Sequence, residues 1–318
     1  MKLKSYQRVF LYLVSVLLLT SLLSPWVYAL WDLILGPWIV ALWNQIFAGQ
    51  PEWQDYRAPF SRFFNRHFMI FAILLFYPCR RLLKIGSMSQ LGLQSIRVGY
   101  RDLLKGFSIA LASIIFLGAA MGLAEVFTIY FRLPFAVGLE RSIKALLTAL
   151  TVGFLEEIFF RGIIFKGLLE DWRPTGAFIG ASLFYAAIHF VKPAQKSYLE
   201  GLEPLAGFSH LIHTFEQFLD PLSILPGLLG LFLLGMLLSY AFIRTSSLYL
   251  SIGLHAGLVF GVKTIRVYGN YTREDLGWIF GSSDPKIISG LAAWIGIIAI
   301  GVFIHTITRK RQKLLTET

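Results

Sequence analysis

The chain alternates long apolar runs with shorter polar connections. The runs are long enough to cross a hydrocarbon core of ~30 Å, which needs about 20 apolar residues of helix. Within each run a period of 3.6 residues is weak, which is typical of helices that lipid and neighbouring helices cover on every side. The eight candidate spans are residues 9–30, 67–83, 107–130, 143–168, 175–191, 224–243, 247–263 and 287–307. The pattern predicts an all-α polytopic membrane protein with about eight transmembrane helices, forming a single membrane domain over residues 1–318.

The connections between the spans indicate what lies on either side of the membrane. Residues 31–66 and 192–223 are predicted outer loops, and residues 84–106 form a predicted cytoplasmic connector. The first loop is rich in tryptophan, which suits an interfacial aromatic belt. The middle of the second loop, GFSHLIHTFEQFL, has helical spacing and is expected to lie in the interface as an amphipathic segment.

Composition and charge agree with a membrane protein and set its orientation. Of the 318 residues 56% are hydrophobic and 15% are charged, whereas about a quarter of a soluble domain is charged. Basic residues cluster before the first span, between the second and third, and after the eighth. The positive-inside rule therefore places both termini in the cytoplasm. The expected location is a prokaryotic plasma membrane, crossed several times.

The basic residues that set the orientation account for most of the net charge of +11. They are also expected to be attracted to anionic lipids of the lipid bilayer. A nucleic-acid partner is not expected, because no basic stripe with interleaved aromatic residues occurs. The basic and apolar start ends in Val27-Tyr28-Ala29 and also resembles a cleavable signal peptide. We interpret it as an uncleaved first span, which the charge pattern of eight spans supports.

The fourth span carries three charged residues near its middle, Glu156, Glu157 and Arg161. Each costs ~2.5–3.5 kcal/mol at the centre of a membrane helix, so their presence needs a reason. Glu157 and Arg161 are four residues apart and can pair on one helix face. Glu156 is turned about 100° from Glu157, and no residue on its own face offsets its charge. A buried ion pair that only fixes helix packing explains Glu157 and Arg161 but leaves Glu156 unexplained.

Two histidines lie at a similar depth on other spans, His189 on the fifth and His255 on the seventh. Either one alone is commonly a satisfied packing residue, but both at the depth of Glu156 favour a shared site. A glutamate carboxylate can take a proton from water, and imidazoles can orient that water or stabilise an oxyanion. The three residues predict a hydrolytic site inside the membrane. Neither GxSxG nor HExxH occurs, and the spans hold no pair of aspartates, which argues against serine and aspartyl intramembrane proteases.

At these residues the sequence resembles the CPBP family of intramembrane proteases, which includes CAAX proteases and bacteriocin-processing enzymes and is also called the Abi family. The motif EExxxR matches residues 156–161 in full. The motif FxxxH matches residues 185–189 with Tyr in place of Phe, and HxxxN matches residues 255–259 with Val in place of Asn. The order and spacing of the motifs agree with the family, and the family core covers about residues 140–263.

The resemblance implies a conical intramembrane cavity lined by the fourth, fifth and seventh spans, and a role for each residue. Glu156 would activate the attacking water, His189 would help to position it, and His255 would stabilise the tetrahedral oxyanion. Glu157 and Arg161 would support the site. The family is described as glutamate-dependent and needing no metal or other cofactor. The alternative is a zinc ion held by Glu156, His189 and His255.

Val259 is the departure from the family pattern that bears most on activity. The Asn usual at this place is thought to help hold the oxyanion, and loss of one such donor typically costs ~10²–10³ in rate. Tyr185 lies four residues before His189 on the same helix face, so its hydroxyl is a candidate replacement donor.

These observations predict a membrane-embedded protease of the glutamic type, a CAAX-protease-like hydrolase. Its expected substrate is a membrane-anchored, lipid-modified or small precursor peptide, which a glutamate-activated water would cut. The alternative is a catalytically weakened or inactive family member that acts as a scaffold, an immunity protein or a transporter.

Overall fold

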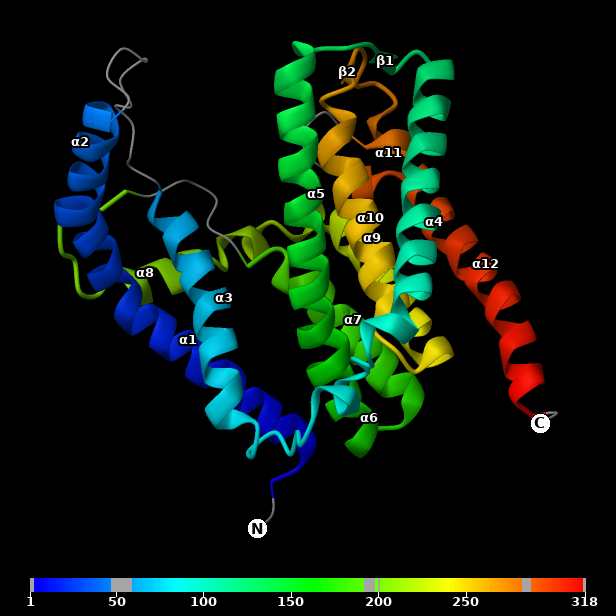
Figure 1. The fold of residues 1–318 in the computed structure, drawn as a ribbon, viewed down its shortest axis with the longest axis horizontal. Helices are drawn as coiled ribbons and strands as arrows, with labels where there is room; N and C mark the ends of the chain where they lie inside the picture. Colours follow the sequence, from blue (N-terminus) through cyan, green and yellow to red (C-terminus); the bar gives the residue numbers. More distant parts are fainter. Residues whose placement is uncertain (1–2, 47–58, 192–197, 200, 282–286, 317–318) are drawn as a thin grey trace. The chain divides into compact units, whose positions relative to one another are not determined.

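The computed structural model describes residues 3–46, 59–191, 198–199, 201–281 and 287–316, which are almost entirely helical (Figure 1). The α-helices among them are Ser5–Leu30 (α1), Gly36–Ile46 (α2), Phe60–Cys79 (α3), Ile96–Leu123 (α4), Phe135–Glu157 (α5), Lys166–Asp171 (α6), Pro174–Ile188 (α7), Ala206–His213 (α8), Pro221–Thr245 (α9), Tyr249–Ile265 (α10), Gly277–Phe280 (α11) and Leu291–Thr316 (α12). The π-helices described are Trp31–Leu35 (η1) and Ile158–Phe165 (η3), and the 3₁₀-helices are Met88–Leu91 (η2), Glu216–Leu219 (η4) and Ile287–Ser289 (η5). The strands are Phe127–Ile129 (β1) and Gly269–Tyr271 (β2).

Several helices are long and apolar enough to cross a bilayer, which confirms the prediction of an all-α membrane protein. Within the described part of the chain they are Ser5–Ile46, Met88–Leu123, Pro221–Thr245 and Leu291–Thr308. A helix also lies in each of the other four predicted spans. Of these, α7 and α10 have only 15 and 17 residues, and α3 and α5 carry charged side chains. The count of eight spans stays a prediction.

The chain divides into two compact units, of which the first consists of Met1–Leu3, Gln7–Lys84 and His189–Pro221. This unit holds most of α1 together with α2, α3 and α8. Aromatic and small side chains form its apolar core: Tyr28, Phe60, Phe64, Leu199 and Ala206. The ring of His210 in α8 packs against that core, with its centroid 5.3 Å and 4.8 Å from those of Phe60 and Phe64. Parts of both predicted outer loops, residues 47–58 and 192–197, lie outside the described residues.

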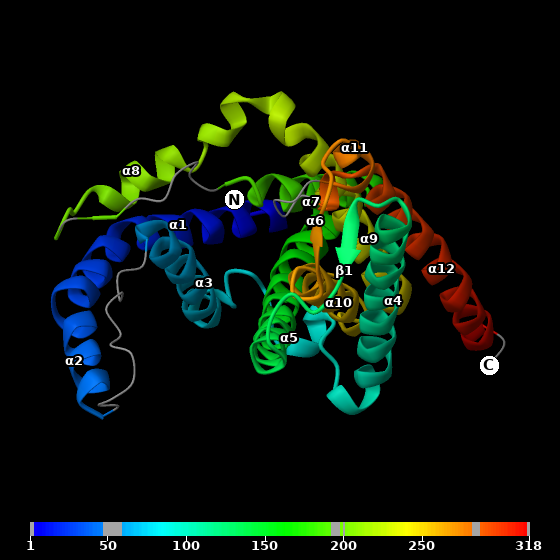
Figure 2. The ribbon, with the colours of Figure 1, turned by 90° about the horizontal axis from the view of Figure 1, so that it is seen from above.

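The second unit consists of Lys4–Tyr6, Ile85–Ile188 and Leu222–Thr318. In it α4, α5 and α10 run side by side, and α10 lies between the other two (Figures 1 and 2). The antiparallel strands β1 and β2 lie at the end of this group where α5 begins and α10 ends (Figure 1). The two glutamates of the first family motif lie at the end of α5 and the third motif lies in α10, so the packing of these helices decides which motif residues meet.

A stripe of glycines lets α10 approach α4 at backbone distance. Gly253, Gly257 and Gly261 recur every four residues, and the nearest atoms to each belong to α4. A Cβ on Gly257 would lie only 2.6 Å from the carbonyl oxygen of Phe107, which no real side chain can do without a backbone shift. Small residues at this spacing are a common means by which membrane helices pack closely. The stripe therefore fixes the side of α10 that faces α4, and the opposite side faces α5.

The third predicted span ends earlier than its hydropathy indicates. The prediction extends it to residue 130, but α4 ends at Leu123 and Phe127–Ile129 forms β1, with Thr128 opposite Asn270 of β2. Residues 126–130 are all β-branched or aromatic, and such side chains favour a strand. Glu125 has a φ of 57°, in the left-handed region, where an α-helix cannot continue. At the other end, residues 96–106 of the predicted connector form the first turns of α4.

Candidate active site

The motif residues meet where the end of α5 lies against the middle of α10. Gly153 lies one helical turn before Glu157, and a Cβ on it would lie 3.1 Å from the backbone nitrogen of Ala256. The lack of a side chain at Gly153 therefore allows the two helices to touch at this level. Because Ala256 follows His255 directly, this contact brings the histidine beside the two carboxylates of the first motif.

A fully buried ion pair joins Glu157 and Arg161. Glu157 is the last residue of α5, and the chain continues as the π-helix η3, which holds Arg161. The arginine Nη1 donates to Oε1 of Glu157 at 2.8 Å, and the two side chains are 1% and 0% exposed. The four-residue spacing predicts such a pair, although the helix that carries it is a π-helix from residue 158 onward. The π-helix is rare and is frequent at functional sites.

Arg161 also contacts two further helices. Its Nη2 donates to the carbonyl oxygen of Gly235 in α9 at 3.4 Å, and its guanidinium carbon lies 4.5 Å from the centroid of the Tyr185 ring in α7. The Tyr185 ring is buried and packs edge-on against Phe160. These three contacts hold the guanidinium group beside Glu157.

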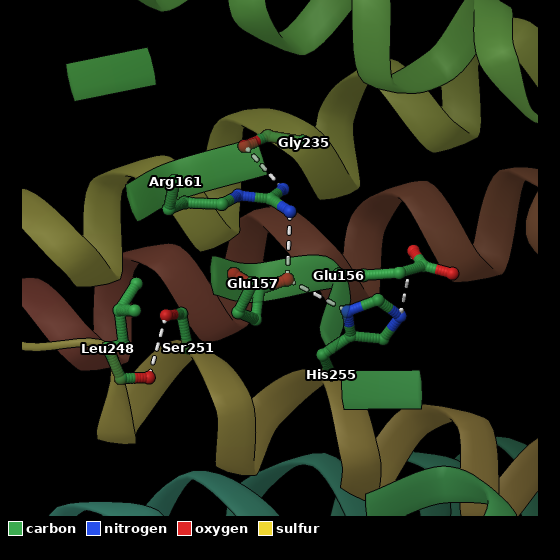
Figure 3. Close-up of polar contacts among 7 residues, drawn as sticks. All are labelled: Glu156, Glu157, Arg161, Gly235, Leu248, Ser251 and His255. Carbon is green, nitrogen blue, oxygen red and sulfur yellow. Dashed lines mark hydrogen bonds and ion pairs between the residues drawn. The ribbon is translucent and has the colours of Figure 1, made fainter. Parts of the chain in front are cut away.

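His255 lies between the two glutamates, as Figure 3 shows. Its Nδ1 lies 2.8 Å from Oε1 of Glu157, the same oxygen that accepts from Arg161. A hydrogen bond to a carboxylate places the proton on Nδ1, so the carboxylate fixes both the tautomer and the orientation of the ring. The other ring nitrogen, Nε2, lies 3.8 Å from Oε2 of Glu156. The sequence predicts Glu156 and His189 as the neighbours of His255, whereas the shorter contact with Glu157 was not predicted.

The two glutamates differ in their access to solvent. The side chain of Glu156 is 26% exposed, whereas that of Glu157 is fully buried. The separation of 3.8 Å between Glu156 Oε2 and His255 Nε2 is too long for a direct hydrogen bond, and Oε2 is itself buried although the side chain is partly exposed. Of the two glutamates, only Glu156 has a partly exposed side chain, whereas the buried Glu157 contacts Nδ1 of the ring.

The remaining predicted site residues lie in different surroundings. Tyr185 is buried in α7, and its ring centroid lies 6.2 Å from that of His255. Val259 follows His255 by one turn of α10 and is partly buried. His189 comes directly after the last residue of α7 and belongs to the other compact unit, so its place beside Glu156 stays a prediction.

The structure brings together two of the three ligands that the zinc alternative requires, Glu156 and His255. No three metal-ligating side chains gather in the described part of the chain. The facing atoms of Glu156 and His255, 3.8 Å apart, are compatible with two ligands of one ion at ~2 Å from each. The third ligand of that hypothesis is His189, in the other unit. The hypothesis therefore stays a prediction.

Comparison with known proteins agrees with the motif analysis. Residues 138–261 match a family model described as type II CAAX prenyl endopeptidase Rce1-like. The matched range contains all three motifs, and it nearly coincides with the predicted family core. No curated protein and no solved structure gave a significant match to the chain.

Proposed function

We propose that the chain, whose residues 138–261 match the model of Rce1-like type II CAAX prenyl endopeptidases, is an intramembrane endopeptidase that uses a glutamate-activated water. The observation that carries the proposal is the position of His255, with buried Glu157 at 2.8 Å from Nδ1 and the partly exposed side chain of Glu156 at 3.8 Å from Nε2. A ring held by one carboxylate and facing another is the arrangement in which a carboxylate and an imidazole act on the same water or carbonyl.

The proposed reaction uses Glu156 as the general base. Its carboxylate takes a proton from water as the water oxygen attacks the carbonyl carbon of the scissile peptide bond. The carbonyl oxygen becomes an oxyanion, which His255 stabilises by donating from Nε2. Glu156 then gives its proton to the leaving nitrogen as the carbon–nitrogen bond breaks, and the carboxylate is restored. His189 helps to position the water.

The proposed step requires a hydrogen on both ring nitrogens of His255. Nδ1 donates to Glu157, and Nε2 donates to the oxyanion that forms.

We further propose that the site opens into a conical cavity between α5, α7 and α10, within a membrane domain of eight spans with both termini in the cytoplasm. The substrate is a membrane-anchored, lipid-modified or small precursor peptide, which reaches the cavity from the bilayer of a prokaryotic plasma membrane.

The direct test compares the C-terminal peptides of the membrane proteome in cells that express the wild type or Glu156→Gln. Peptides that the wild type produces are expected to disappear in the variant. Glu140→Gln is the matched control, because Glu140 is an exposed acid on the same helix and pairs with Lys144. Equal peptide profiles for the wild type and Glu156→Gln, at equal expression, contradict the proposal. Activity that survives a chelator removes the zinc version.

The second candidate is a weakened or inactive member that acts as a scaffold, an immunity protein or a transporter. The observation that favours it is Val259, an apolar side chain where the family has an amide. A cellular function that persists in Glu156→Gln supports this candidate.

A further inference from the structure

A strongly basic pocket lies at the opposite end of the same two helices that carry the motif residues. It has a volume of about 450 Å³ and is lined by Arg132, Arg141, Lys144, Ala145, Thr148, Lys263, Arg266 and Val267. It lies at the end where α5 begins and α10 ends, beside the strands β1 and β2 (Figure 1). Eight residues of α10 separate His255 from Lys263, which is ~12 Å of helix. The pocket is therefore distinct from the candidate active site.

Helix geometry places the basic side chains around one hollow. The α5 residues of the lining recur at positions 141, 144, 145 and 148, and those near the end of α10 at positions 263, 266 and 267. Both spacings place side chains on a single helix face. Ala145 and Val267 are buried apolar members of these two rows. The cations thus converge on one hollow instead of spreading over the surface.

Most of these basic side chains have no ion-pair partner among the described residues. Lys144 pairs with Glu140, whose carboxylate also interacts electrostatically with Arg141. No ion pair with Arg132, Arg141, Lys263 or Arg266 is found within the described residues. Lys263 and Arg266 are stabilised by their place at the C-terminal end of α10, where the helix dipole favours cations. Arg141 and Lys144 lie in the first half of α5 and have no such support.

The positive-inside rule does not explain the cluster. In the proposed topology this end of α5 and α10 lies on the outer side, where basic residues are normally scarce. A group of five Lys and Arg side chains around one hollow on that side therefore indicates a bound anion.

Exposed aromatic side chains place the pocket at the level of lipid headgroups. Tyr130, Phe131, Phe135 and Tyr268 are 46%, 77%, 76% and 39% exposed, and each is close in sequence to a lining residue. The rings of Phe131 and Tyr268 pack edge-on with centroids 6.1 Å apart. Aromatic rings of this kind are enriched where membrane helices meet the headgroup layer.

We propose that this pocket binds the phosphate of an anionic phospholipid headgroup in the outer leaflet. Arginine guanidinium groups match phosphate oxygens in paired hydrogen bonds, and lysines add point charges. The headgroup phosphate lies among Arg132, Arg141 and Arg266, and the acyl chains follow the exposed apolar surface of α5. This binding is independent of peptide hydrolysis, and the two proposals can fail separately.

The test measures lipid binding by the full-length protein in nanodiscs of phosphatidylcholine alone or mixed with phosphatidylglycerol. Native mass spectrometry after release counts the retained lipids. The wild type is expected to retain phosphatidylglycerol preferentially, and added salt should weaken the preference. Arg141→Gln with Arg266→Gln should lower the affinity on the order of 10-fold to 30-fold, because each basic residue near a membrane surface contributes ~1 kcal/mol.

The matched control removes two exposed basic residues elsewhere, Arg97→Gln with Lys105→Gln, and should keep the preference. The charge-conserving pair Arg141→Lys with Arg266→Lys should restore most of it, which separates charge from folding. Equal retention of phosphatidylglycerol by the wild type and the double Gln variant overturns the proposal. Inorganic phosphate alone is the second probe. If it displaces the lipid at millimolar concentration and binds as tightly by itself, the site is one for free phosphate and the lipid assignment is wrong.

Discussion

His255 Nδ1 and Glu157 Oε1 lie 2.8 Å apart, and both side chains are buried. The same carboxylate oxygen accepts from Arg161. Oε1 of Glu157 therefore contacts both the buried guanidinium group of Arg161 and the ring of His255, which the proposed reaction needs. A change at Glu157 should alter stability and activity together, whereas a change at Glu156 should alter activity with much less effect on stability.

The two glutamates can be separated by replacing each with glutamine. Glu157→Gln leaves Arg161 buried without its carboxylate, and breaking a buried ion pair commonly costs ~3–5 kcal/mol of unfolding free energy. Glu156→Gln should cost far less, because its side chain is partly exposed. Thermal unfolding in detergent measures the difference, and peptide cleavage should be lost in both variants. Equal stability of the two variants contradicts the distinct roles given to them.

The glycine stripe of α10 predicts a packing defect at a single position. Gly257→Ala places a methyl group 2.6 Å from the carbonyl oxygen of Phe107 and should destabilise the protein by ~1–3 kcal/mol through overpacking. Gly296→Ala in α12 is the control, because no heavy atom lies within 4 Å of its added Cβ. In a helix interior that change should be neutral or stabilising by up to ~1 kcal/mol. Both variants are compared by thermal unfolding, and a neutral Gly257→Ala would show that α4 and α10 can separate at little cost.

Val259→Asn restores the amide of the family motif. If the natural site lacks one oxyanion donor, the substitution should raise kcat on the order of 10²-fold with a small effect on KM. The control Val259→Ile keeps the side chain apolar and should leave kcat close to that of the wild type. An unchanged kcat in Val259→Asn means that this position does not reach the oxyanion.

Tyr185 is the candidate substitute for that missing donor. Tyr185→Phe removes only the hydroxyl and keeps the ring that packs against Phe160 and Arg161. Cleavage should fall ~10²-fold or more if the hydroxyl stabilises the oxyanion. In the double variant with Val259→Asn the loss should be smaller, since the amide then does the same work. Full activity of Tyr185→Phe would remove the hydroxyl from the mechanism.

The first compact unit should lose stability in acid through His210. Burial, and to a smaller extent the nearby His213, lowers the pKa of His210 from 6.5 to about 4. Between these two values the unfolded chain binds a proton that the folded unit excludes. The stability is therefore complete above about pH 6.5 and falls as the pH approaches 4. His210→Phe should flatten this part of a plot of thermal midpoint against pH. If the plot keeps the same slope in the variant, the loss of stability in acid is caused by a titratable group other than His210.

The sequence predicts the local relationships of the site better than the contacts between helices. The Glu157–Arg161 pair follows from a four-residue spacing, and the motifs alone indicate the family. The Glu157–His255 contact depends on how deeply α5 and α10 approach each other, which is set at Gly153 and Ala256 and has no signal in either helix by itself. The strand at residues 127–129 was missed because hydropathy ranks a β-branched apolar run as part of a span.

The backbone contact between α4 and α10 also limits how this protein can be altered. Side chains that meet through flexible ends can adjust to a new neighbour, but Gly253 and Gly257 lie against main-chain atoms of α4, which cannot adjust in this way. A library of variants along α10 should therefore be mostly nonfunctional on that side, whatever the substrate. Changes of specificity are to be sought on α5 and α7, away from the backbone contact between α4 and α10.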